Sequence, residues 1–206
     1  MSPFKSSSSP IAPVSILFRS SSLPTGVTGL PGAANKHTST RYESKVSVTG
    51  GLSGAFRGSI YPDNLNVKGY LLNGTYNVFL GFHKPGIPTD QDLEVRTNGF
   101  RAVLVINQGN SLRVKSNNPA KTTSVGIHIH NGYKHWTATH PMSEGCLLIH
   151  PADWSKFISL FLKAFPMLSD WSINGSRVGR QIGTVTVQCS RPLGDFDVLR
   201  KETAIA

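Results

Sequence analysis

Short apolar runs that alternate with polar residues, separated by turn-forming residues, dominate the first two thirds of this chain. Val46-Ser47-Val48-Thr49 alternates with a period of two, which is the period of a half-buried β-strand. Residues 67–72 and 75–82 flank Asn73-Gly74, the strongest short signal for a β-hairpin. The 20 Gly and 13 Pro fit many short strands and turns better than a helical bundle. Further strands are predicted at 100–107, 112–115 and 184–189.

One segment departs from this pattern and has the spacing of a helix. Pro151 and Asp153 suit a first helical turn, and Pro166 is expected to end the helix. Apolar residues recur between them at intervals of three and four: Trp154, Phe157, Ile158, Phe161, Leu162 and Phe165. We therefore expect a mainly β (α+β) fold, a β-sandwich or barrel of short strands with one principal helix packed against it.

The length of 206 residues allows one domain with a sizeable core, and composition divides the chain into three parts. Residues 1–45 are rich in Ser, Pro, Gly and Thr and are predicted to form an N-terminal arm. Within that arm, Val14 to Phe18 could dock as an edge strand. Residues 46–190 are the predicted folded domain, and residues 191–206 are a polar C-terminal tail.

The formal net charge of +10 suggests an anionic neighbour, such as nucleic acid, an anionic membrane or an acidic cell-wall polymer. The basic residues are scattered and do not interleave with aromatic residues, which disfavours a dedicated nucleic-acid platform. No stretch reaches the roughly 18 apolar residues of a membrane span. The apolar run Ile11 to Phe18 resembles a signal peptide only superficially, because Pro13 and Ser15 interrupt it and Arg19 ends it.

The side chains that could take part in catalysis are concentrated between positions 126 and 150, where five of the seven histidines lie. In a strand, His128 and His130 would share one face. A thiol near neutral pH is mostly protonated and needs a base, which His130 could provide for Cys146, with His128 as a possible partner. Gly145 would let the backbone bend before the nucleophile, and nearby amides could form an oxyanion hole. Ser143 could form hydrogen bonds within that turn.

The other side chains of this segment have less specific interpretations. Tyr133 and Trp136 could line a substrate groove or pack the loop. His135 and His140 are expected to face solvent. His150 could share the face of Cys146 or cap the following helix.

The two cysteines, Cys146 and Cys189, are too few for a disulfide framework. A single bridge between them would prevent Cys146 from acting as a nucleophile, and we prefer a thiol at that position beside the histidines. Cys189 is interpreted as a small residue within a strand.

The same segment contains two short motifs, Ile129-His130-Asn131-Gly132 and Ser143-Glu144-Gly145-Cys146-Leu147-Leu148. Together they resemble the signature of the L,D-transpeptidase (YkuD-like) catalytic domain. The family signature has a histidine near a glycine, a spacer of this length, then Ser/Thr-x-Gly-Cys and an apolar strand. Glu144 stands where the commonest form has histidine and is similar to a divergent branch that reads Thr-Glu-Gly-Cys. Upstream, residues 72–78 resemble the family's Pro-x-Gly-x-Tyr-x-Val hairpin without its proline.

The resemblance spans roughly residues 65 to 165 and implies an activity. Cys146 would attack the carbonyl that follows a meso-diaminopimelate or similar centre in a peptidoglycan stem peptide. His130 would take the thiol proton and later protonate the leaving amine, while the Gly145 and Cys146 amides would hold the oxyanion. The thioester would pass to an amine (L,D-transpeptidase) or to water (L,D-carboxypeptidase), with no cofactor and no metal.

The resemblance also bears on substrate contacts. Tyr133, Trp136 and Glu144 are the candidate substrate-binding residues. Because Glu144 replaces a histidine, one possible helper of thiolate formation is missing. Glu144 either points away from the thiol or orients a histidine such as His128.

Two alternatives from other functional classes stay open. A zinc-dependent hydrolase could use His128 and His130 together with His135, His140, Cys146 or His150, although no His-x3-His or Cys-x2-Cys spacing appears. A non-catalytic module that binds cell wall or nucleic acid is the other.

Peptidoglycan chemistry takes place in the periplasm or cell wall, yet we find no convincing signal peptide. We therefore expect a protein that is secreted or delivered into a target cell as an antibacterial effector. Its expected partners are peptidoglycan stem peptides, a secretion-system carrier and an immunity protein. Nucleic acid is not an expected partner, and no integral membrane segment is expected.

Overall fold

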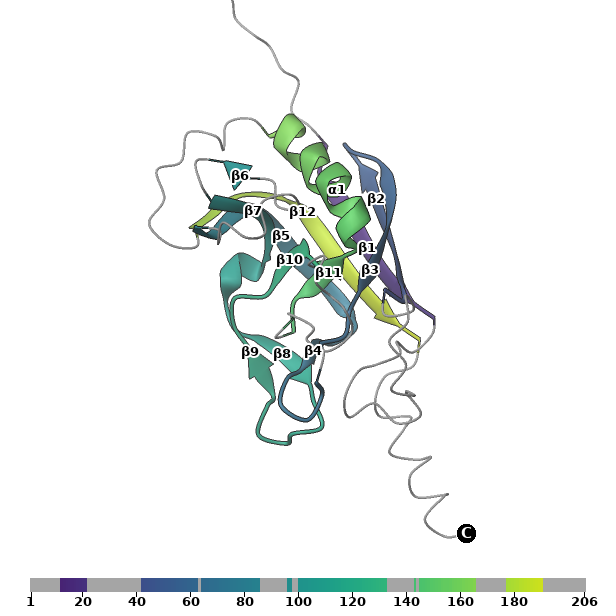
Figure 1. The fold of residues 1–206 in the computed structure, drawn as a ribbon, viewed down its shortest axis with the longest axis vertical. Coiled ribbons are helices and arrows are strands. Elements are labelled where there is room, and N and C mark those ends of the chain that lie inside the picture. Colours follow the sequence, from purple (N-terminus) through teal and green to yellow (C-terminus); the bar gives the residue numbers. More distant parts are fainter. Residues whose placement is uncertain are drawn as a thin grey trace, which may run out of the picture.

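The computed structural model (Figure 1) describes residues 12–21, 42–62, 64–85, 96–97, 100–132, 143, 145–165 and 177–190. The strands of the main sheet are β1 (Val14–Ser20), β2 (Ser44–Gly50), β3 (Gly54–Ser59), β5 (Gly74–Pro85), β6 (Arg96–Thr97), β7 (Phe100–Ile106), β10 (His128–Asn131), β11 (Leu147–Ile149) and β12 (Arg177–Cys189). A smaller sheet contains β4 (Tyr70–Leu71), β8 (Leu112–Lys115) and β9 (Thr123–Ser124). One α-helix, α1 (Pro151–Ala164), occurs in the described residues.

The main sheet closes on itself. Its strand order is β10-β11-β3-β2-β1-β12-β5-β7-β6, and an additional pairing joins β10 to β7. The small sheet has the order β4-β8-β9 and lies below β10 and β11 in Figure 1. Because closure leaves the strands with an inner and an outer face, the alternation of each strand decides which side chains enter the core.

Strand β1 shows how the sequence sets this alternation. Val14, Ile16 and Phe18 are buried in the core, whereas Ser15 and Arg19 are exposed. The strand runs parallel to β12 on one side and antiparallel to β2 on the other. The expectation of an arm whose 14–18 segment docks at an edge is thus wrong for this segment, which is a central strand of the domain.

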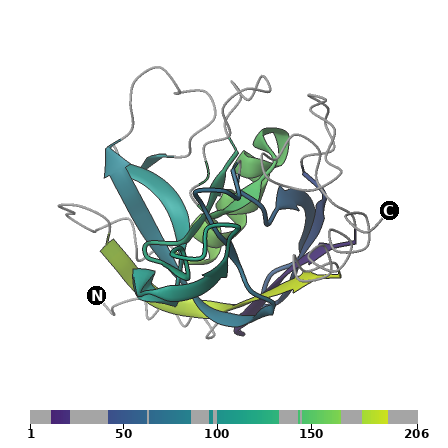
Figure 2. The same ribbon diagram turned by 90° about the horizontal axis from the view of Figure 1, so that it is seen from below.

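Helix α1 lies on the concave side of the curved sheet, inside the ring of strands (Figure 2). Its buried residues, Trp154, Phe157, Ile158 and Phe161, have the three- and four-residue spacing predicted from the sequence. The ring of Phe157 packs edge-on against that of Phe56 in β3, with centroids 5.1 Å apart. A helix of this length is marginal in isolation, so this apolar face is what holds it in place.

The predicted hairpin at Asn73-Gly74 does not form. Strand β4 pairs with β8, and β5 pairs with β12 and β7, so the two segments belong to different sheets. Asn73 instead pairs with the backbone of Cys189: its Nδ2 donates to the Cys189 carbonyl over 3.0 Å, and its Oδ1 accepts from the Cys189 amide over 2.7 Å. The Asn73 side chain therefore bonds to a distant strand, at the position where a hairpin turn was expected.

The predicted mainly β fold with one principal helix is confirmed in the described residues, as are the strands at 100–107, 112–115 and 184–189. Within the part of the chain that the structure describes, no helix has the length and apolar character needed to cross a membrane.

Candidate active site

The parallel pairing of β10 with β11 brings the histidine and cysteine motifs together. Ile129 lies beside Leu147, and His130 lies beside Leu148. The same register, carried back by one residue, sets His128 beside Cys146. Ile129 and Leu147 belong to the core, so the neighbouring positions His128, His130 and Cys146 face the opposite, outer side of the sheet.

The sulfur of Cys146 receives a backbone hydrogen bond from the adjacent strand. The amide N–H of His128 donates to Cys146 Sγ over 3.4 Å. A hydrogen bond to sulfur stabilises a thiolate more than a thiol, so this contact favours the nucleophilic form. Cys146 is partly exposed, whereas His128 is buried, so Cys146 is the more accessible residue of this pair.

The ring of His130 has a defined tautomer. Its Nδ1 lies 2.8 Å from the carbonyl oxygen of Asn131, and a carbonyl can only accept, so Nδ1 carries the proton. This places the acceptor lone pair on Nε2, the atom that would act as a general base. His130 lies two residues along the strand from His128, roughly 7 Å, which is within the combined reach of an imidazole and a thiol side chain.

The turn before Cys146 is held by the buried hydroxyl of Ser143. Its Oγ donates to the Cys146 carbonyl over 2.7 Å and accepts from the Gly145 amide over 3.2 Å. Gly145 has a φ of 120°, and a Cβ there would collide with the carbonyl oxygen of Gly69. Both facts require glycine at this position, because a residue with a side chain would be strained and would displace the neighbouring backbone.

The hydrogen bond from the Gly145 amide also bears on the expected oxyanion hole. That amide is engaged by Ser143 Oγ in this structure. To stabilise an oxyanion, Gly145 would have to exchange this bond for one to the substrate. The role of the Gly145 amide therefore remains a prediction, and the bond to Ser143 is its competitor.

Tyr42, which no sequence pattern indicated as a site residue, contacts the backbone of the histidine motif. The hydroxyl of Tyr42 donates to the Gly132 carbonyl over 2.7 Å, and the Tyr42 ring fills the place where a Cβ of Gly132 would lie. The same ring packs edge-on against His150, with centroids 4.5 Å apart. Tyr42 falls within the Ser- and Pro-rich region, where composition gave no indication of a contact with the site.

His150 is a helix cap rather than a partner of the thiol. Its Nδ1 accepts from the Ala152 amide over 3.1 Å at the start of α1. Burial, with a further contribution from the Arg57 cation, lowers the pKa of His150, which favours the neutral ring that this cap requires. Of the two interpretations of His150, the structure therefore supports the cap.

Glu43 is a second residue that the sequence did not single out. Its Oε1 accepts from Ser44 Oγ over 2.8 Å and from the Ile60 amide over 3.1 Å. Its Oε2 is buried with no hydrogen-bond partner in the described residues. Burial of this carboxyl raises its pKa from 4.5 to about 7, so Glu43 changes its charge near neutral pH.

Cys189 lies on the other side of the sheet and is not disulfide-bonded to Cys146. Its Sγ lies 2.7 Å from the hydroxyl of Tyr61 in the core. Burial, followed by the interaction with Cys189, raises the pKa of Tyr61. The interpretation of Cys189 as a small residue within a strand is confirmed, and its side chain is buried.

Several predicted site residues lie outside the described residues. They are Tyr133, His135, Trp136, His140 and Glu144. Within the described residues, no three His, Cys, Asp or Glu side chains are grouped as a metal site would need. The described part of the site therefore consists of Cys146, His130, His128, Ser143 and Gly145, supported by Tyr42.

Comparison with known proteins adds no assignment to this geometry. No protein-family model matches the chain, and no curated protein or solved structure is significantly similar to it.

Proposed function

We propose that the protein is a cysteine-dependent acyltransferase or hydrolase of peptidoglycan stem peptides, an L,D-transpeptidase or L,D-carboxypeptidase. The observation that supports this most is the relation between β10 and β11. A partly exposed thiol with an amide donor to its sulfur lies on the same face as a histidine whose Nδ1 bond leaves Nε2 as the acceptor. The resemblance of the Ser143–Cys146 and Ile129–Gly132 motifs to the family signature supplies the substrate class.

In the proposed reaction, His130 Nε2 takes the thiol proton of Cys146, and Sγ attacks the carbonyl carbon of the stem peptide. The tetrahedral intermediate collapses with cleavage of the C–N bond, and His130 returns the proton to the leaving amine. A second amine, or water, then attacks the thioester carbonyl. His130 accepts its proton, and Cys146 leaves as the thiolate.

The test is mass spectrometry of muropeptides incubated with wild-type protein and with Cys146→Ala. We expect loss of a terminal D-alanine, or its exchange for another D-amino acid, with the wild type only. The substitution should lower turnover by at least about 10³-fold, because the nucleophile itself is removed. Identical muropeptide profiles for both proteins would refute the proposal.

Chelation separates this proposal from a zinc hydrolase. Under the thiol mechanism, iodoacetamide abolishes turnover and a chelator leaves it unchanged. Turnover that survives alkylation and disappears with a chelator would instead support the metal alternative.

We further propose that the protein acts in the periplasm or cell wall as an antibacterial effector, with an immunity protein as its antagonist. Expression in the cytoplasm should be harmless, and export to the periplasm should be toxic only while Cys146 is intact. Toxicity in the cytoplasm, or toxicity of exported Cys146→Ala, would rule this role out. The second result would favour a non-catalytic wall-binding module.

A further inference from the structure

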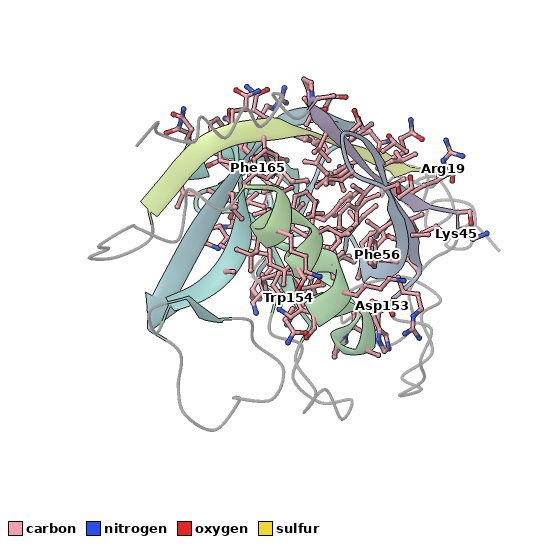
Figure 3. All side chains as sticks on the ribbon, turned by 90° about the horizontal axis from the view of Figure 1, so that it is seen from above. Arg19, Lys45, Phe56, Asp153, Trp154 and Phe165 are labelled. Carbon is pink, nitrogen blue, oxygen red and sulfur yellow. The ribbon has the colours of Figure 1, made fainter. Side chains whose placement is uncertain are left out.

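A row of basic side chains crosses three neighbouring strands on the outer face of the main sheet. Arg19 of β1 lies opposite Lys45 of β2, and Lys45 lies opposite Arg57 of β3. All three residues are exposed. In Figure 3, Arg19 and Lys45 extend outward, on the side of the strands that faces away from α1.

Such a row opposes folding unless something offsets it, because like charges directly opposite each other on antiparallel strands repel. Arg57 is offset by Asp153, which accepts from Arg57 Nε over 2.9 Å and from Nη2 over 3.1 Å. Arg19 donates its Nε to the neutral Gln188, and neither Arg19 nor Lys45 has an ion pair with another described residue.

The described residues contain no other carboxylate that could neutralise Arg19 and Lys45. Their acidic residues are Asp153, which is paired with Arg57, and Glu43. The Glu43 carboxyl is directed at the Ile60 amide and the Ser44 hydroxyl. Two adjacent cations therefore keep their charge available for an anion from outside the described residues.

The row lies on the same face of the sheet as the candidate active site, and the buried residues Leu148 and Ser59 lie between the two. His130 lies beside Leu148, and Leu148 lies beside Ser59 in β3. Arg57 is two residues from Ser59 and shares its face, since the side chains of a strand alternate. By the same register Arg57 lies opposite His150, four residues from Cys146, or roughly 13 Å along the strand. One extended polymer could contact the thiol and the row together.

We infer that Arg19 and Lys45, with Arg57 at the end of the row, form a docking surface for the carboxylate-bearing strands of peptidoglycan. The choice of polymer rests on the proposed function, because the same polymer would present its stem peptide to Cys146. Exposed cations matched to repeated carboxylates give binding that weakens as salt screens the charges. The half-buried Leu17 lies on this face, but most neighbouring side chains there are small and polar: Ser15, Ser47, Thr49, Thr184 and Thr186. A long polymer can therefore lie flat against the sheet.

The test is co-sedimentation with isolated peptidoglycan sacculi, using Cys146→Ala protein so that no turnover occurs. In that background, R19Q/K45Q should bind on the order of tenfold more weakly at low salt, because two exposed charge contacts are lost. The matched control is K156Q/K163Q, which removes the same charge from two exposed positions on α1. We expect its binding to stay within about twofold of the parent.

Equal losses of sacculus binding in the two variants would show that only net charge matters, and would overturn the docking surface. Unchanged binding in both variants would also overturn it. Amidation of the sacculus carboxylates should abolish the difference between the variants, and a difference that persists would also overturn it. A row-dependent loss seen with duplex DNA and not with sacculi would identify nucleic acid as the partner, against this inference. Circular dichroism and the thermal midpoint verify that both variants fold.

Muropeptide analysis with wild-type protein separates the docking surface from the proposed chemistry. Row-dependent binding with unaltered muropeptides would retain the docking surface and reject the proposed reaction. Altered muropeptides with row-independent binding would retain the reaction and reject the docking surface.

Discussion

The hydroxyl of Tyr42 donates to the carbonyl oxygen of Gly132 over 2.7 Å, and this bond joins residues 90 positions apart. Gly132 follows the His130-Asn131 pair whose backbone carbonyl fixes the histidine tautomer. Because Gly132 has no Cβ, the Tyr42 ring can lie directly against its backbone. The position of the candidate base is therefore braced by a residue at the far end of the domain's sequence.

Tyr42→Phe should slow turnover while leaving the fold intact. It removes one hydrogen bond to a buried carbonyl, at a cost of about 1 kcal/mol of stability. The matched control is Tyr76→Phe, which removes a similar bond of 2.8 Å to the Leu72 carbonyl. Chemical denaturation should show similar losses for both variants, whereas only Tyr42→Phe should reduce kcat. Equal turnover in the two variants would show that Tyr42 is merely structural.

The two histidines of β10 should differ sharply in their importance. His130→Gln removes the proposed general base and should lower kcat/KM by about 10²- to 10⁴-fold. His128→Gln keeps the backbone N–H that donates to Cys146 Sγ, so its loss should be much smaller. The rate of iodoacetamide alkylation near neutral pH gives a second measurement, and it should fall mainly in His130→Gln. Similar losses for both histidines would contradict the assigned roles.

Gly145→Ala should destabilise the protein far more than Gly126→Ala. Both glycines have positive φ, 120° and 64°, but the space beside Gly126 is open, whereas Gly145 faces the Gly69 carbonyl. We expect a cost of about 1 kcal/mol at Gly126 from the left-handed conformation alone, and a larger cost at Gly145 from added collision. Urea denaturation measures both, and equal costs would show that the Gly145 turn can relax.

Glu43 should make stability fall as pH rises through neutrality. Its pKa is about 7 in the folded protein and near 4.5 when exposed, so between these values the folded state holds a proton that the unfolded state has lost. The stabilisation is complete below pH 4.5 and is lost as pH rises through 7, by up to about 3 kcal/mol.

Glu43→Gln removes this titration while keeping an oxygen that can accept from the Ile60 amide. The free energy of unfolding of the variant relative to wild type should therefore increase between pH 5 and pH 8. Urea denaturation of both proteins at each pH provides the comparison, in which titrations common to both cancel. Parallel pH profiles would show that the Glu43 carboxyl does not titrate in this range.

Local patterns in the sequence were sufficient to predict many elements. The alternation Val46-Ser47-Val48-Thr49 indicated β2, and the spacing from Trp154 to Phe161 indicated α1. A strand that carries His128 and His130 was also expected, and the resemblance to the family signature implied the apolar strand after Cys146. These features are local, because the period of hydrophobic residues depends only on the geometry of the element that contains them.

Pairing between distant segments was decided by the tertiary structure alone. Asn73-Gly74 has the composition of a hairpin, yet Asn73 bonds to the backbone of Cys189, 116 residues away. Arg19 likewise meets Gln188 across 169 residues, because β1 pairs in parallel with β12. Strand β1 also pairs with β2 and so lies in the centre of the sheet rather than at its edge. The polar composition around β1 indicated a peripheral arm. The alternation within the strand could not correct this, because it is the same at an edge as in the centre of a sheet.

The candidate site shows the same division. The sequence by itself determined Cys146, His130, Ser143 and Gly145 as candidates, because each belongs to a short motif with a recognisable chemical purpose. Tyr42 and the buried carboxyl of Glu43 entered only with the fold. Their roles depend on which backbone groups lie nearby after the sheet closes, and contacts of that kind leave no periodic or local trace in the sequence.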